Sequence, residues 1–142
     1  MRFLRLLHLN LLNYQKSKIE SIDSSTCSYY YLIESLNEVE RLNMKTITTD
    51  ELLKKIDAGE QVNIIDVREQ EEVDAGIIPG AKHIALGQVE TSLDQIDPSV
   101  PHYIICKAGG RSAMACEILE ENGYDVTNVT GGMMAWDGEV QF

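Results

Sequence analysis

Residues 102–112 read His-Tyr-Ile-Ile-Cys-Lys-Ala-Gly-Gly-Arg-Ser, an apolar run followed by a thiol, a glycine pair and a basic residue. The run over 102–105 is short and rich in aromatic and β-branched residues, which predicts a buried β-strand. After the glycine pair, apolar residues recur at helical spacing as far as Asn122, so a helix is expected there. Cys106 thus lies between a strand and a helix, and ligands of parallel α/β sheets bind at such junctions.

The segments on either side continue this alternation of strands and helices. A polar cap at Thr48 or Thr49, followed by acids and then lysines, predicts a helix that ends at Gly59. The other expected elements are a short apolar segment at 46–47, a buried strand within 62–67 that ends at Asp66, one or two helical turns at 69–75, a strand at 81–85, an amphipathic segment at 89–96, a strand at 124–129 and a helical turn at 133–136. Together they predict an α/β fold with a small, open, mostly parallel sheet flanked by helices.

The charge is distributed unevenly along the chain. Five basic residues balance five acidic ones over 1–43, whereas 44–142 carry seven basic and eighteen acidic residues and account for the net charge of -11. Residues 44–142 are expected to form the domain. Residues 1–43 form an N-terminal extension without a consistent strand or helix period, which we expect to be flexible or absent from the natural protein.

Charge and hydropathy argue against two classes of partner. Nucleic acid is not expected, because phosphate binding requires clustered Lys and Arg that the acidic domain lacks. The apolar run near the N-terminus is interrupted by Arg5, His8 and Asn10, lacks a cleavage site and is too short to span a bilayer. An apolar stripe within 3–11 leaves a membrane-surface helix as an alternative, although it has few of the cations that such helices use.

The cysteine and histidine content argues against a disulfide framework and a metal site. Cys27, Cys106 and Cys116 are odd in number and unevenly spaced, and the three histidines are scattered. We therefore expect no metal or other cofactor and a reducing compartment, the cytoplasm. Cys27 is treated as incidental. Cys116 lies inside the predicted helix, where core packing is favoured over a role as a resolving thiol.

Cys106 has the surroundings of a reactive thiolate. Gly109 and Gly110 allow successive backbone N–H groups to turn inward, and the following helix adds the positive end of its dipole. Lys107 and Arg111 add full positive charges. All of these features lower the pKa of a cysteine and would hold the terminal sulfur of a persulfide or the oxygens of a thiosulfonate. The alternative, a small buried residue at a strand end, leaves the basic residues and glycines unexplained.

Four motifs in order resemble the rhodanese family of sulfurtransferases in its single-domain bacterial form. They are Asp-Val-Arg-Glu at 66–69, Gly-Ile-Ile-Pro-Gly-Ala-Lys-His-Ile at 76–84, Cys-Lys-Ala-Gly-Gly-Arg-Ser at 106–112 and Asn-Val-Thr-Gly-Gly-Met-Met-Ala-Trp at 128–136. The resemblance covers essentially all of 44–142 and none of 1–43.

The resemblance implies that Cys106 takes sulfane sulfur from thiosulfate or a persulfide donor. It would pass the sulfur to a thiophilic acceptor: cyanide in vitro, and a thiol or sulfur-carrier protein in vivo. Asp66 and Arg68 would brace the loop, a structural more than a chemical role. The substrate-binding cradle would consist of the main-chain amides of the loop, from Lys107, Ala108, Gly109, Gly110, Arg111 and Ser112.

Two departures and two rival functions qualify this expectation. Ile77 stands where the family usually has His, and the short C-terminus after Trp136 would leave one edge of the pocket more open.

A binding or sulfur-relay module without enzymatic turnover is one alternative function. A cysteine phosphatase or arsenate reductase is the other. Phosphatases resemble one another in placing five residues between Cys and Arg, whereas four separate Cys106 from Arg111 here.

Overall fold

The computed structural model describes residues 43–142, and Met44–Phe142 form one compact unit. The expectations for residues 1–42, including those for Cys27 and the apolar stripe, lie outside the described residues. Within 43–142, no helix has both the length and the apolar character needed to cross a membrane.

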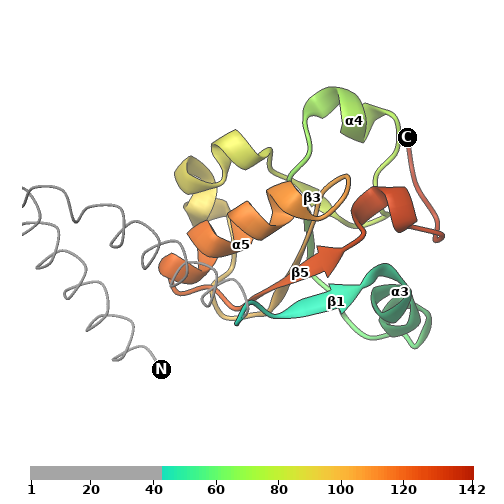
Figure 1. Ribbon diagram of the computed structural model, residues 1–142, viewed down its shortest axis with the longest axis horizontal. Helices are drawn as coiled ribbons and strands as arrows, with labels where there is room; N and C mark the ends of the chain where they lie inside the picture. The colour runs from blue at the N-terminus through green and yellow to red at the C-terminus, as the bar shows by residue number, and fades with distance from the viewer. Residues whose placement is uncertain (1–42) are drawn as a thin grey trace, which may run out of the picture. The chain divides into compact units, whose positions relative to one another are not determined.

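The core of the fold is a five-stranded sheet in which every strand pairing is parallel. Its spatial order is β1-β5-β4-β2-β3, so β4 lies at the centre. Figure 1 shows β1 beside β5 at one edge. This arrangement confirms the expected α/β fold. The strands are β1 (Thr46–Thr48), β2 (Ile64–Asp66), β3 (Lys82–His83), β4 (His102–Ile105) and β5 (Val126–Thr130).

Residues 43–142 also form three α-helices and three short 3-10 helices, of which all but the last lie between strands. The α-helices are α3 (Thr49–Asp57), α4 (Gln70–Asp74) and α5 (Gly110–Glu121), and the 3-10 helices are η1 (Leu86–Gln88), η2 (Glu90–Gln95) and η3 (Gly132–Ala135). The predicted cap of α3 is present: the Thr48 hydroxyl accepts from the Glu51 amide at 3.2 Å, and the Glu51 carboxylate accepts from the Thr48 amide at 2.9 Å.

Apolar residues on the two faces of the sheet form separate clusters. On one face, Ala115, Cys116 and Leu119 of α5 pack with residues of η1, η2 and the sheet, including Ile104. On the other face, Leu52 of α3 packs with sheet residues, and Met133 and Trp136 contact this cluster from the C-terminal segment. The central strand β4 is therefore covered on both faces of the sheet. This packing fixes the position of Cys106, which follows β4.

Some elements differ from the sequence-based expectation. The segment at 46–47, expected only as a short apolar stretch, is strand β1, which pairs with β5 at the edge of the sheet. Strand β1 has only three residues, of which the first and third are exposed and the second is half-buried. Such a short alternation is not enough to predict a strand from sequence. The segment at 89–96 folds as 3-10 turns, and the strand expected at 81–85 covers only Lys82–His83.

Candidate active site

Cys106 follows β4 directly, between the neighbouring strands β5 and β2. Helix α5 begins four residues later, after Gly109, whose backbone is left-handed with φ of 107°. This conformation favours glycine and lets the chain turn sharply from the strand into the helix. The loop therefore curls around its own first residue.

The sulfur of Cys106 lies at the focus of this loop. The Gly109 amide donates to Sγ at 3.1 Å, and the Ser112 hydroxyl lies 3.3 Å from it. Burial alone would raise the pKa of the Cys106 thiol. The hydroxyl and amide of Ser112 and the amides of Gly109 and Ala108 act in the opposite direction, so the pKa falls below its ordinary value. Cys106 is therefore a buried cysteine whose pKa is lowered despite its burial.

Ser112 is itself held by the adjacent strand. Its Oγ lies 2.6 Å from Oδ1 of Asn128 on β5 and 3.1 Å from the Gly109 carbonyl. The Asn128 amide group also donates to the Gly109 carbonyl at 3.3 Å. The hydroxyl has one proton and three possible acceptors, the sulfur included, so Asn128 influences where that proton goes. The sequence analysis assigned no role to Asn128, although a buried polar residue within an apolar strand is a signal.

The segment that follows β5 also contacts the loop at 106–112, through backbone hydrogen bonds. The Met133 amide donates to the Cys106 carbonyl at 2.8 Å, and the Met134 amide donates to the Lys107 carbonyl at 3.0 Å. Gly132 has φ of 59°, and a β-carbon there would lie 2.5 Å from the backbone of Cys106 and Lys107. No other residue type fits this contact without moving the loop. The sequence motif contained this glycine, but its role was not predicted.

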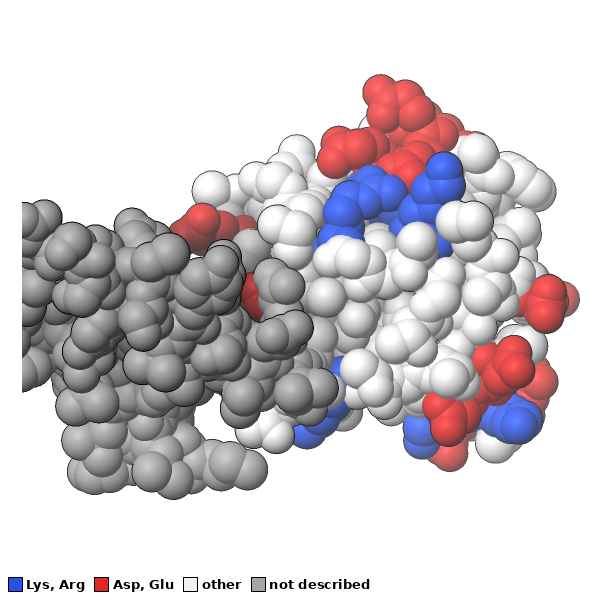
Figure 2. All heavy atoms as spheres, in the orientation of Figure 1, with Lys and Arg blue, Asp and Glu red and all other residues white. Residues whose placement is uncertain are grey.

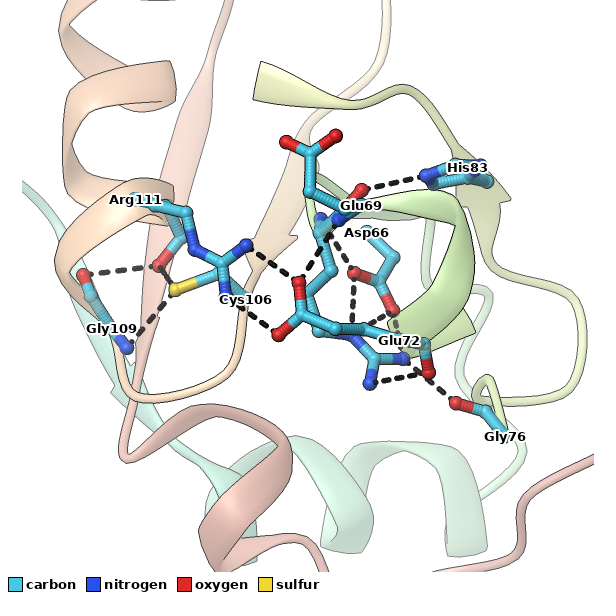
Figure 3. Close-up of polar contacts among 10 residues, drawn as sticks. Asp66, Glu69, Glu72, Gly76, His83, Cys106, Gly109 and Arg111 are labelled. Carbon is cyan, nitrogen blue, oxygen red and sulfur yellow. Dashed lines mark hydrogen bonds and ion pairs between the residues drawn. The ribbon is translucent and has the colours of Figure 1, made fainter. Parts of the chain in front are cut away.

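Arg111, in the first turn of α5, reaches toward α4. Its Nη1 and Nη2 donate to the two oxygens of Glu72 at 2.7 and 2.8 Å, a bidentate pair that is about one-third exposed (Figure 3). The hydrogen bonds from Arg111 lower the pKa of Glu72 to about 2, although partial burial opposes them. The sequence analysis did not identify Glu72, because neighbouring acids in the same helix look alike in sequence.

Asp66 and Arg68 form a buried ion pair at the end of β2. Nη2 of Arg68 lies 2.7 Å from Oδ2 of Asp66 and 2.7 Å from the Gly76 carbonyl, while Nη1 donates to the Glu72 carbonyl at 3.1 Å. Among the hydrogen bonds of the described residues, none joins either side chain to the loop at 106–112. The pair holds the α4 segment, and Glu72 of that segment binds Arg111.

The remaining predicted residues are placed as follows. Lys107, Ala108 and Gly110 are exposed at the rim of the loop. Cys116 is fully buried, and burial together with nearby acids raises its pKa to about 12.

Over residues 43–142, no group of three or more His, Cys, Asp or Glu side chains could hold a metal ion. The described site thus consists of a buried sulfur with a lowered pKa, surrounded by backbone amides and the Ser112 hydroxyl.

Comparisons with known proteins match the same part of the chain. The model of the rhodanese-like domain family matches residues 48–139. A Bacillus subtilis protein named "Putative sulfurtransferase YtwF" is 43% identical over 70% of this chain and 97% of its own length. Another, named "Putative sulfur carrier protein YrkF", is 40% identical over 67% of this chain and about half (52%) of its own length.

A solved structure gives the same answer for the fold. The rhodanese-like domain protein of Staphylococcus aureus is 44% identical and superposes with a TM-score of 0.67, covering 70% of this chain and 98% of that one. Sequence motifs, sheet topology and these matches all coincide over the same residues. The chain belongs to the rhodanese-like domain family.

Proposed function

We propose that this chain is a thiosulfate or persulfide sulfurtransferase in which Cys106 carries the transferred sulfur as a persulfide. The observation that supports this most directly is the convergence of backbone and hydroxyl donors on one buried sulfur whose pKa is lowered. Such donors stabilise the attacking thiolate and would then stabilise the terminal sulfur of the persulfide in the same place. The names of the relatives, which refer to sulfur transfer and sulfur carriage, support the same chemistry.

The reaction has two balanced steps. The Cys106 thiolate attacks the outer sulfur of thiosulfate, a new S–S bond forms, the S–S bond of the donor breaks, and sulfite leaves with its electron pair. The acceptor then attacks the terminal sulfur, and the thiolate of Cys106 is the leaving group. With cyanide the product is thiocyanate, and with a thiolate acceptor it is a new persulfide.

Two other functions are less well supported. A phosphatase or arsenate reductase would need Arg111 to bind the oxyanion, but both terminal nitrogens of Arg111 are bound to Glu72. A sulfur-relay or binding module without turnover of small donors would use the same persulfide and differs only in its partner. The acidic domain would favour a basic acceptor protein.

We further propose that residues 44–142 suffice for the activity and that the protein works in the cytoplasm, where a thiol remains reduced. Cys106 and Cys116 are both free in the described part of the chain.

The test is a thiosulfate–cyanide assay with the full chain and with Cys106→Ser. Thiocyanate production is expected from the native chain and not from the variant. Mass spectrometry after incubation with thiosulfate alone should show one added sulfur atom on the peptide that contains Cys106. Cys116→Ser serves as the matched control and should retain both signals. Undiminished turnover by Cys106→Ser would refute the proposal.

A further inference from the structure

The charge of Arg111 is already compensated before any donor arrives. Both of its terminal nitrogens bind the Glu72 carboxylate, and Glu72 remains ionised because its pKa is about 2. In Figure 3 the guanidinium lies between the sulfur of Cys106 and this carboxylate, and the negative charges of Glu72, Cys106 and Glu69 all act on Arg111. The arginine beside the nucleophile is therefore part of an ion pair and not a free anion-binding group.

The surface around this pair is acidic. Residues 69–81, which include α4, contain Glu69, Glu71, Glu72 and Asp74 and neither Lys nor Arg. Figure 2 shows acidic side chains over α4, directly against a small group of basic side chains. Lys107 and Arg111 are positive and Glu69 and Glu72 are negative, so these four side chains together carry no net positive charge that could attract a dianionic donor.

We propose that Glu72 is a specificity-determining residue: by holding Arg111, it disfavours dianionic sulfur donors and favours persulfides or thiosulfonates that carry fewer negative charges. This inference rests on the proposed sulfur transfer and specifies the donor class. Glu72 does not touch the reacting atoms. It acts through Arg111, whose charge would otherwise be available to the sulfonate oxygens of the donor.

Donors that share one reacting group but differ in charge test the idea. Thiosulfate carries two negative charges, ethanethiosulfonate carries one, and 2-aminoethanethiosulfonate carries a compensating ammonium group. In each case the Cys106 thiolate forms a bond to the outer sulfur, and sulfite or the corresponding sulfinate leaves with the electron pair. Cyanide is the common acceptor, and kcat/KM is measured for each donor at several ionic strengths.

The informative variant is Glu72→Gln, which keeps an oxygen acceptor for Arg111 and removes the charge. We expect kcat/KM for thiosulfate to rise about tenfold relative to that for 2-aminoethanethiosulfonate, with ethanethiosulfonate between them, as one uncompensated charge acting through a surface dielectric predicts. The matched control is Glu71→Gln. It removes the same charge from α4, and Glu71 has no resolved effect on Arg111, so the donor ratio should stay within about twofold for this screened, exposed charge.

The outcomes separate this inference from the proposed function. Equal changes for all three donors in Glu72→Gln, or equal ratios in Glu72→Gln and Glu71→Gln, would overturn the role of Glu72 while leaving sulfur transfer intact. Turnover that does not require Cys106 would overturn the proposed function itself. If Glu72→Gln fails to fold, the salt series of the native chain decides: the thiosulfate rate should rise with ionic strength relative to the zwitterionic donor, and a fall contradicts the inference.

Discussion

The two described cysteines of this protein are both almost inaccessible to solvent, and their pKa values are shifted in opposite directions. Cys106 is 1% exposed and Cys116 is 0% exposed, and both belong to the same apolar cluster. The pKa of Cys106 is lowered, whereas burial raises the pKa of Cys116 to about 12. Burial is the largest single influence on both thiols. At Cys106 the amides and the hydroxyl of the loop together outweigh it, whereas Cys116 has no such donors among its influences. Burial alone makes a thiol inert, and convergent donors make it a nucleophile.

The largest effect on Cys106 is expected from a substitution that displaces its loop, residues 106–112. In Gly132→Ala, the new methyl group would meet the backbone of Cys106 and Lys107 at 2.5 Å in a left-handed conformation. We expect a loss of about 2–5 kcal/mol in the free energy of unfolding, from overlap and backbone strain together, and near-complete loss of sulfur transfer. Urea denaturation and the thiosulfate–cyanide assay measure the two effects.

The chain provides a matched control for this substitution. Gly80 also has a positive φ, 80°, but no atom lies within 4 Å of the position that a β-carbon would take there. Gly80→Ala should therefore cost only about 1 kcal/mol, the conformational part of the effect, and retain full activity. Equal losses in the two variants would mean that contact with the loop is unimportant.

A more selective change removes one donor. Ser112→Ala deletes the hydroxyl that contributes most to lowering the pKa of Cys106, so this pKa should rise and the thiolate should form at higher pH. Below the pKa, a rise of one unit corresponds to about tenfold slower alkylation. Iodoacetamide labelling as a function of pH, resolved by peptide mass spectrometry, measures the shift.

Ser99→Ala is the control for this experiment, because Ser99 is an exposed serine bound to Asp97 at a distance from the loop. Its alkylation profile should match that of the native chain. An unshifted profile in Ser112→Ala would show that the backbone amides alone stabilise the thiolate.

The other cysteine should tolerate replacement. Cys116→Ala removes one buried sulfur from a packed helix face, with an expected loss of about 1 kcal/mol and an unchanged rate of sulfur transfer. In the native chain, Cys116 should resist alkylation until denaturant unfolds the domain. Loss of turnover in Cys116→Ala, with the fold intact, would instead identify Cys116 as a resolving thiol.

The smallest effect is expected at the N-terminus. A chain that starts at Met44 should keep the melting temperature and the sulfur-transfer rate of the full chain, because residues 1–43 are charge-neutral and lack a consistent period. A large fall in melting temperature would assign these residues to the fold. Loss of membrane association with unchanged activity would indicate an anchor.

Sequence reasoning succeeded where neighbours in sequence determine structure. The run before Cys106, the glycine pair and the helix that follows are contiguous, so their local preferences predicted the strand, the loop and α5. The predicted cap of α3 is equally local. That Cys106 is the catalytic residue stays a prediction, since the structure gives its surroundings and not its reaction.

The residues that sequence reasoning missed act across the fold. Glu72 meets Arg111, Asn128 meets Ser112, and Gly132 meets the Cys106 backbone only after the sheet brings β2, β4 and β5 together. Strand β1 is too short to be predicted from its own residues, and its partner β5 lies near the other end of the described chain. Such contacts depend on topology, which no local pattern contains.

The parallel pairing of β4 with β5 has a consequence for the protein during its synthesis. Asn128 and the amides of Met133 and Met134, which hold the Cys106 loop, leave the ribosome after Cys106 itself. A nascent chain that ends before Asn128 would therefore contain Cys106 without these supports, and its thiol should not yet react rapidly. Ribosome-stalled chains of increasing length should gain fast iodoacetamide labelling of Cys106 only after residue 134 has emerged. Cys106 is therefore expected to become reactive only after the segment that supports its loop has been synthesised.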